Sequence, residues 1–256
     1  MKCEPAFLTL ADRRLAYQQL RAVSENERKA PLFFLSGYGS DMTGTKASFL
    51  AERCASTGRA FLRFDYRGHG ASDGDFVDGT IGAWFDDALA VFDQLTEGPQ
   101  LLVGSSMGGW IALLLAKARP ERVAGFVGVA AAPDFTEDLV RPRLTPAQRA
   151  QLEREGLTHD EDAPPDFRLP MTARLLDEAR NHLVLRAPLP LNAPVHLLQG
   201  QRDADVPWGH ALRLAEGLSG ADVRVTLIKD GDHRLSRPQD LALLWQTVET
   251  MGARES

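Results

Sequence analysis

The sequence has few cysteines, no long run of apolar residues and no block of basic residues. Its two cysteines, Cys3 and Cys54, are too few for a disulfide framework, and their spacing matches no metal-binding motif. We therefore expect buried or free thiols in a reducing compartment. No apolar stretch approaches the roughly 20 residues that a membrane-spanning helix needs, so we expect no stable membrane insertion. The net charge of −6 argues against a nucleic-acid partner.

The first residues also lack the features of a targeting signal. The stretch MKCEPAFLTLADRR contains only a short apolar patch interrupted by charged residues, which is not a secretion signal. The first expected strand begins within this stretch and leaves no room for a transit peptide. The sequence therefore predicts a cytoplasmic protein.

Short apolar segments alternate with segments of helical spacing along most of the 256 residues. Continuous apolar strands separated by helices indicate an α/β fold with a mostly parallel sheet covered on both faces. The turn-like ADRR between the first two apolar segments predicts an N-terminal hairpin. The expected strands lie at 6–10, 15–20, 31–37, 60–66, 100–104, 123–131, 194–200 and 223–231. The expected helices lie at 43–58, 80–98, 107–119, 208–218 and 238–251, with Thr80 as an N-cap and Gly98 as a C-terminal stop.

One segment, from Pro133 to Pro190, departs from this alternation. It is rich in charge and proline, and it contains at least two helical patterns but no convincing strand. We expect a single domain over residues 1–256, with this segment inserted as a helical cap over the edge of the sheet.

The segment LLVGSSMGGW, residues 101–110, places two serines among glycines between an expected strand and an expected helix. It fits G-x-S-x-G in one frame only, with Ser106 between Gly104 and Gly108. A nucleophile on a sharp strand-to-helix turn needs neighbours without side chains two residues before and after it. The alternative is a run of small residues that only allows close helix packing. The context favours Ser106 as a nucleophile, and Ser105 as a small residue in a tight site.

A serine hydroxyl needs a base, and the base needs an acid to orient it, in the chain order serine, acid, histidine. Asp203 directly follows an expected strand, which favours it over Asp205, two residues further on. His233 follows the last expected strand in a loop that can reach the same sheet edge. The other histidines fit less well: His196 is expected inside a strand, His210 on the surface or flank of a helix, His69 in a tight structural loop, and His159 and His182 in the insertion.

Acyl transfer also needs two backbone N–H groups for the negative charge that develops on the attacked oxygen. Met107, the residue after the candidate nucleophile, is expected to supply one. Tyr38, in the glycine-containing loop SGYGSDMTG after the strand at 31–37, is expected to supply the other. This chemistry implies no metal and no organic cofactor.

The motifs together resemble the α/β-hydrolase superfamily over essentially the whole chain. DYRGHGASDG is similar to its D-x-R-G-x-G-x-S segment, and GQRDADVP to its acid loop. A closer resemblance, carried by SGYGSDMTGTKA and GPQLLVGSSMGGW, is to the mitochondrial palmitoyl-protein thioesterases that also act as acyl-glucuronide esterases. It implies a serine hydrolase that releases long-chain acyl groups from thioesters, on small molecules or S-acylated proteins. Ser36 stands where many superfamily members carry a histidine before the oxyanion glycine.

The substrate class is less constrained by the residues. In the insertion, Leu175, Leu176, Ala179 and Leu183 recur at helical spacing and could bind an acyl chain, or could pack on the body of the protein. A small-ester carboxylesterase or perhydrolase with the same three residues is the main alternative function. A non-catalytic ligand-binding member of the fold is the other.

Overall fold

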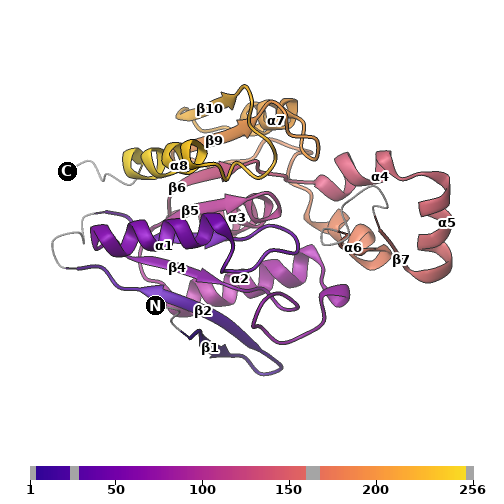
Figure 1. Ribbon diagram of the computed structural model, residues 1–256, viewed down its shortest axis with the longest axis horizontal. Coiled ribbons are helices and arrows are strands. Elements are labelled where there is room, and N and C mark those ends of the chain that lie inside the picture. The colour runs from indigo at the N-terminus through magenta and orange to yellow at the C-terminus, as the bar shows by residue number, and fades with distance from the viewer. Residues whose placement is uncertain (1–3, 24–28, 160–167, 252–256) are drawn as a thin grey trace.

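The computed structural model describes residues 4–23, 29–159 and 168–251, and a central sheet with helices on both sides forms its body (Figure 1). The strand order is β1-β2-β4-β3-β5-β6-β9-β10. Strand β2 runs antiparallel to β1 and β4, and the remaining neighbours are parallel. Within the described residues the strands of this sheet are β1 (Ala6–Thr9), β2 (Arg14–Leu20), β3 (Leu32–Leu35), β4 (Phe61–Phe64), β5 (Gln100–Ser105), β6 (Val123–Val129), β9 (Val195–Gly200) and β10 (Val223–Ile228). The α/β fold and the N-terminal hairpin expected from the sequence are confirmed.

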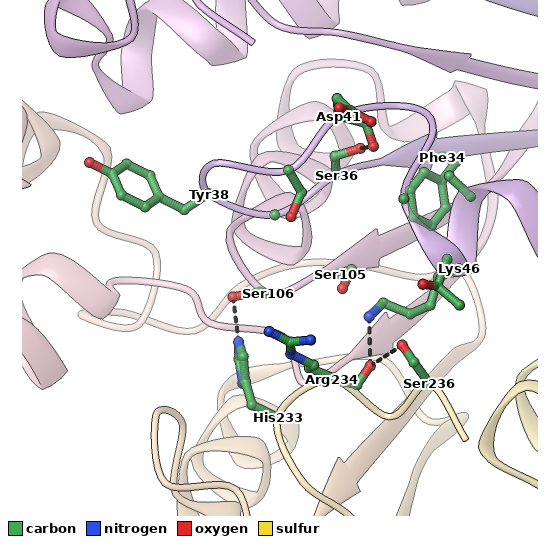
Figure 2. A pocket seen from close by; sticks show the side chains of 15 residues that line it. Phe34, Ser36, Tyr38, Asp41, Lys46, Ser105, Ser106, His233, Arg234 and Ser236 are labelled. Carbon is green, nitrogen blue, oxygen red and sulfur yellow. Dashed lines mark hydrogen bonds between the residues drawn. The ribbon is translucent and has the colours of Figure 1, made fainter. Parts of the chain in front are cut away.

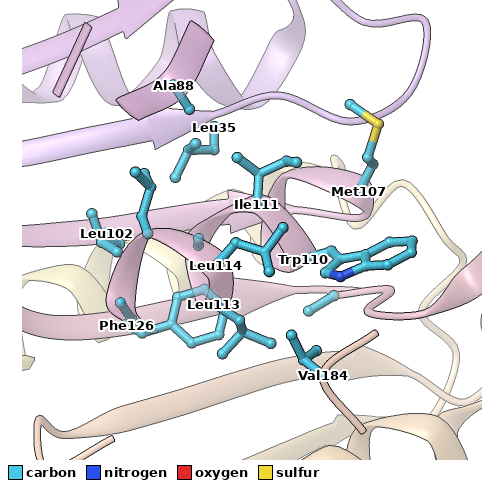
Figure 3. Close-up of a cluster of buried hydrophobic side chains, with 14 of the residues drawn as sticks. Leu35, Ala88, Leu102, Met107, Trp110, Ile111, Leu113, Leu114, Phe126 and Val184 are labelled. Atoms are coloured by element: carbon cyan, nitrogen blue, oxygen red, sulfur yellow. The ribbon is translucent and has the colours of Figure 1, made fainter. Parts of the chain in front are cut away.

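The two faces of the sheet carry separate sets of helices. Helices α1 and α8 contact each other, and their apolar residues form one core cluster with residues of the sheet. Helices α2, α3 and α7 cover the opposite face, where Leu35, Leu102 and Ile111 belong to a second and larger cluster (Figure 3). Strands β3 and β5 are consequently buried at every position. The helices have the bounds α1 (Thr45–Thr57), α2 (Ile81–Leu95), α3 (Met107–Ala118), α7 (Trp208–Gly217) and α8 (Pro238–Met251), with 3-10 turns η2 (Phe76–Asp78) and η3 (Pro120–Arg122). None of the helices in the described ranges is long and apolar enough to cross a membrane.

The helix ends follow the local sequence with one exception. Thr80 caps α2 as expected, because its side-chain oxygen accepts from the N–H of Ala83. Helix α2 ends at Leu95 with Thr96 as its C-cap, not at Gly98. The hydroxyl of Thr96 donates to the carbonyl of Phe92, so a side chain satisfies part of the helix end before the glycine is reached.

The strand order changes direction at the centre of the sheet. From β3 the chain moves to β4 on one side, and then crosses to β5 on the other side of β3. The loops that follow β3 and β5 therefore leave the same edge of the sheet as neighbours. In open α/β sheets, ligands bind outside the carboxyl ends of the strands at such a switch point.

The segment between β6 and β9 lies to one side of the sheet, and it appears in salmon colours in Figure 1. The carboxylate of Asp134 joins its two ends, accepting from the N–H groups of Val184 and Leu185 at 2.8 and 2.9 Å. The short antiparallel pair β7–β8 was not expected from the sequence, since two-residue strands leave no periodic pattern. The elements described here are η4 (Thr136–Val140), α4 (Arg141–Arg143), α5 (Pro146–Glu155), β7 (Leu157–Thr158), β8 (Met171–Thr172), α6 (Ala173–Glu178) and η6 (Ala179–His182).

A buried carboxylate fastens two loops to helix α2. The Asp87 side chain is fully buried and accepts from Arg13 Nε at 2.7 Å and from Arg67 Nη2 at 2.8 Å. It also accepts from the backbone N–H of Arg67 at 2.8 Å. One carboxylate thus holds the β1–β2 turn and the loop after β4 against the same helix.

We predict that Asp87→Asn lowers the free energy of unfolding by about 3 kcal/mol, because it leaves both guanidinium groups without their buried counter-charge. The control is Asp12→Asn, since Asp12 also pairs with Arg13 but is exposed. That substitution should change stability by less than about 0.5 kcal/mol. Chemical denaturation measures both, and equal losses would contradict the role given to Asp87.

Candidate active site

Ser106 stands at the sharp turn between β5 and α3. Its φ and ψ are 52° and −119°, an uncommon conformation for a residue with a side chain. A Cβ atom at Gly104 would lie 2.5 Å from the carbonyl oxygen of Gly108, and one at Gly108 would lie 2.1 Å from that of Leu35. Helix α3 can start this close to the sheet only because both positions are glycine, which is the reason the sequence motif has glycines there.

The structure brings Ser106, His233 and Asp203 into one hydrogen-bonded chain, and Figure 2 shows the bond between Ser106 and His233. The His233 Nε2 atom lies 3.1 Å from Ser106 Oγ, and its Nδ1 atom lies 2.8 Å from Asp203 Oδ2. A proton on Nδ1 is donated to the carboxylate, which leaves Nε2 as the acceptor for the serine hydroxyl. This arrangement can remove a proton from Ser106 and return it to a departing group.

Asp203, and not Asp205, is the carboxylate that contacts His233. Its Oδ1 atom accepts from the N–H groups of Asp205 and Val206 at 2.9 and 2.8 Å. Its Oδ2 atom accepts from Gln199 Nε2 at 2.9 Å as well as from His233. The Asp203 side chain is fully buried, whereas Asp205 is exposed.

Two carboxylates and an imidazole close together are also the kind of group that binds a metal ion. Ligand atoms of Asp203, Asp205 and His233 lie within 4.8 Å of one another. The four donors bonded to Asp203 already occupy the acceptor sites of its two oxygens. The carboxylate is therefore engaged in orienting His233, and we assign it no metal.

The two expected oxyanion amides follow two neighbouring strands at the same sheet edge. Met107 is the first residue of α3, and Tyr38 follows β3. Neither amide donates a hydrogen bond to another residue in the described ranges. Gly37 packs closely on the serine, since a Cβ there would lie 3.3 Å from Ser106 Cβ.

The Tyr38 side chain points away from Ser106 (Figure 2) and contacts the segment between β6 and β9. Its hydroxyl donates to the carbonyl of Pro170, and its ring packs against Phe76, Trp84 and Phe135. Burial raises the pKa of Tyr38, so the hydroxyl keeps its proton and remains a donor. The loop that carries the Tyr38 amide is thus held from the side opposite the serine.

His69 also holds this loop in place, which agrees with the structural role expected for it. It is 4% exposed, and its Nε2 atom accepts from the N–H of Gly39 at 3.2 Å. Burial lowers the pKa of His69, which favours the neutral ring that can accept this bond.

His210 was expected on the surface or flank of its helix, but the structure buries it. It is 6% exposed, and its Nε2 atom lies 2.8 Å from the carbonyl oxygen of Pro133. The start of the inserted segment covers this part of α7, which the helix sequence alone does not reveal. His196 lies within β9 as expected, half-buried, with Nε2 2.8 Å from Thr226 Oγ1.

The candidate acyl-binding leucines of α6 do not line the pocket beside Ser106. Leu175 and Leu176 are 1% and 2% exposed, and Leu175 belongs to the larger core cluster together with Ala179. Leu175 and Ala179 pack on the body of the protein and Leu176 is buried, which favours the packing alternative over acyl recognition.

A pocket of about 320 Å³ opens beside Ser106 and His233. It is also lined by Lys46, from the first turn of α1, and by Arg234. Sequence reasoning missed both residues. The adjacency of Arg234 to His233 was a usable signal, whereas nothing in the sequence around Lys46 points to the site. Gln199, bonded to Asp203, was missed too, because its strand gives no hint of which side chains face the acid loop.

Comparison with known proteins gives this site a family. A family model described as "Serine aminopeptidase, S33" matches residues 26–160. The mouse palmitoyl-protein thioesterase ABHD10, mitochondrial, is 39% identical over 241 residues, which are 93% of this chain and 78% of the relative. The chain therefore belongs to the same α/β-hydrolase family as this thioesterase. It is a serine hydrolase that acts on esters or thioesters.

Solved structures support the assignment of this chain to the α/β-hydrolases. A putative hydrolase from Agrobacterium vitis S4 matches with a TM-score of 0.90 and 41% identity, covering 97% of this chain and 98% of the other. The α/β-hydrolase domain-containing protein 10 from mouse matches with a TM-score of 0.86 and 36% identity, with the same coverage.

The cytoplasmic location expected from the first residues is contradicted. The mouse, bovine and rat relatives, which match over 93% or more of the chain, are named as mitochondrial. The expectation rested on a short N-terminal stretch, whereas the likeness extends through the folded body. The thiol expectation holds for Cys54, which is buried and unpaired, and burial raises its pKa to about 12. Cys3 lies outside the described residues.

The hydrogen bonds around Asp203 and Asp205 predict different outcomes when each residue is substituted. Asp203→Asn should lower turnover by about 10⁴, because an amide cannot hold the imidazole in the tautomer that accepts from Ser106. Asp205→Asn, the matched control, should cost less than about tenfold, since only the backbone of Asp205 contacts Asp203. Steady-state hydrolysis of an acyl thioester measures both. A larger loss at Asp205 would reverse the assignment.

Burial of the α6 leucines predicts a loss of stability without a change of specificity. Leu175→Ser should lower the free energy of unfolding by about 3 kcal/mol and leave the preference for acyl-chain length unchanged. Leu212→Ser, at a leucine that is 42% exposed on α7, is the control and should be nearly neutral. A changed chain-length profile at undiminished stability would restore Leu175 to the substrate pocket.

Proposed function

We propose that this α/β-hydrolase cleaves acyl thioesters through an acyl-enzyme intermediate on Ser106, with His233 as the base and Asp203 as the residue that orients it. The observation that carries the proposal is the unbroken hydrogen-bonded chain from Ser106 Oγ to Asp203 Oδ2, with distances of 3.1 and 2.8 Å. The position of Ser106 at the elbow after β5 supports it, because the hydroxyl is presented at the sheet edge where ligands of α/β proteins bind.

In the first step, Ser106 Oγ attacks the acyl carbonyl carbon while its proton passes to His233 Nε2. The oxyanion that forms accepts hydrogen bonds from the N–H groups of Met107 and Tyr38. The imidazolium is stabilised by the buried carboxylate of Asp203, and its Nε2 proton is then given to the departing thiolate or alkoxide.

In the second step, a water molecule attacks the acyl-enzyme. His233 takes a proton from this water, and the same two amides hold the second oxyanion. The bond to Ser106 Oγ breaks, the proton returns to the serine, and the carboxylic acid leaves. The reaction is balanced by water alone.

The preference for long-chain thioesters rests on relatives. The curated relatives that match over most of the chain are named palmitoyl-protein thioesterases. We infer the same substrate class for this chain, either as a small-molecule thioester or as an S-acylated protein. A panel of acyl thioesters, simple esters and acyl glucuronides, each at graded chain length, tests this inference. Preference for long acyl thioesters is the expected result.

A small-ester carboxylesterase is the second candidate. The pocket beside Ser106 favours it, because its volume of about 320 Å³ is at the small end of the range for ligand pockets. Long apolar chains are recognised mainly through buried apolar area, at roughly 0.8 kcal/mol for each methylene. Specificity constants that fall as the chain lengthens would select this candidate over the thioesterase.

We further propose that Pro133–Pro190 acts as a cap of a single domain. Two contacts support this role. The Arg143 guanidinium donates to the carbonyls of Ala204 and Asp205, at 3.3 and 3.0 Å, and Tyr38 donates to Pro170. The segment therefore contacts both the loop that carries Asp203 and the loop that carries Tyr38.

The two adjacent serines give the sharpest test of the mechanism. Ser106→Ala should lower turnover by about 10⁶ with an unchanged melting temperature, whereas Ser105→Ala should retain most of it. A fluorophosphonate probe should label the wild type and the Ser105 variant but not the Ser106 variant. Absence of labelling in the folded wild type would favour the non-catalytic alternative, and a dead Ser105 variant would refute the elbow assignment.

A further inference from the structure

Gln199 is a buried polar residue to which the mechanism above gives no part. It lies near the end of β9, four residues before Asp203, and it is fully buried. A primary amide is costly to bury, because its carbonyl oxygen and its two N–H groups each need a partner. A glutamine in this position therefore needs an interaction that an apolar residue could not make.

The Nε2 atom of Gln199 faces three oxygen atoms. It donates to Asp203 Oδ2 at 2.9 Å and to the carbonyl of Val206 at 3.0 Å, whereas the carbonyl oxygen of Gly200 is further away at 3.4 Å. The two hydrogens of the amide match the two shorter contacts. Because all three neighbours are acceptors, the amide cannot turn round without placing its own oxygen against them. Its orientation is therefore fixed by its surroundings.

The other end of the same amide has no such match. The Oε1 atom of Gln199 is buried, and no donor bonds to it within residues 4–23, 29–159 and 168–251. A buried acceptor without a donor destabilises the folded state. Methionine has about the same length and would avoid this cost. The two bonds donated by Nε2 are thus what glutamine provides here and methionine would not.

These two bonds complete the support of the Asp203 carboxylate. Its Oδ1 atom is held by the backbone N–H groups of Asp205 and Val206, at 2.9 and 2.8 Å. Its Oδ2 atom accepts from Gln199 and from His233. Without the amide, His233 would be the remaining donor to Oδ2 among the described residues, and nothing else would hold that oxygen toward the imidazole. The second amide N–H bonds the carbonyl of Val206, so it also holds the backbone that supports Oδ1.

We propose that Gln199 is a positioning residue for the reaction, and that its amide directs Oδ2 of Asp203 at Nδ1 of His233. The imidazole then keeps the tautomer and the orientation in which its Nε2 atom accepts from Ser106. Hydrogen bonds to the groups around a reacting residue fix its rotamer in this way. This inference rests on the proposed mechanism, and it adds a residue that acts on the base only through the acid.

Gln199→Met tests the proposal, because it removes the N–H groups and keeps the length of the side chain. We expect kcat for an acyl thioester to fall by about tenfold with KM unchanged, since a hydrogen bond to a charged group is lost. The melting temperature should change by less than about 3 °C, because removal of the unsatisfied oxygen offsets the two lost bonds. His196→Met is the matched control and should keep the wild-type kcat. It removes a hydrogen-bonded side chain from the same strand, whose partner is Thr226 on β10.

A double-mutant cycle with Asp203→Asn separates positioning from a purely structural role. If Gln199 acts through Asp203, Gln199→Met should lower kcat by less than about twofold in the Asp203→Asn background. An equal loss in both backgrounds, or a single variant whose kcat is within about twofold of the wild type, would overturn the proposal and leave the mechanism in place. Undiminished hydrolysis by Ser106→Ala would overturn the mechanism instead. Gln199→Asn, whose amide is drawn back from Asp203 by one methylene, supplies the same comparison if the methionine variant does not fold.

Discussion

Helix α3 begins directly against the backbone of strands β3 and β5, and the geometry of the whole site depends on this contact. A Cβ at Gly108 would lie 2.1 Å from the carbonyl oxygen of Leu35, and a Cβ at Gly104 would lie 2.5 Å from the carbonyl oxygen of Gly108. Any side chain at these two positions would push the helix away from the sheet. Ser106 is held at a positive φ by this packing, with its carbonyl accepting from Gly109 and Ala132. The hydroxyl is thereby fixed relative to the loops that follow the neighbouring strands.

The other groups reach Ser106 because parallel strands end at one edge. Asp203 follows β9 and His233 follows β10, and each loop is fastened by its own hydrogen bonds. The loop of His233 is fixed by Arg237, whose guanidinium bonds the carboxylates of both Asp230 and Asp240. The imidazole therefore meets the serine with little freedom to rotate away. In the proposed mechanism, a base held in this position lowers the cost of reaching the transition state.

The same fold supports many chemistries, so the substrate has to be argued from the pocket and not from the sheet. The pocket beside Ser106 is lined by several serines, by Lys46 and by Arg234, and also by apolar surface such as that of Phe34. The leucines of α6 are used in packing. An acyl chain would then have to lie on the other side of the scissile carbonyl, toward the segment that Tyr38 contacts through Pro170.

The sequence by itself determined the α/β fold and the identity of the three residues that meet at the sheet edge. The glycine spacing around Ser106 and the strand ends before Asp203 and His233 are local features, and parallel topology converts them into proximity. The burial of His210 could not be predicted because it depends on a segment remote in the chain, and the β7–β8 pair could not be predicted because its strands are too short to have a period. The same is true of Lys46, whose ammonium donates to a carbonyl 188 residues away. Only the tertiary structure decides which remote residues contact each other. A sequence pattern indicates which face of a helix a side chain occupies, but not which distant segment packs against that face.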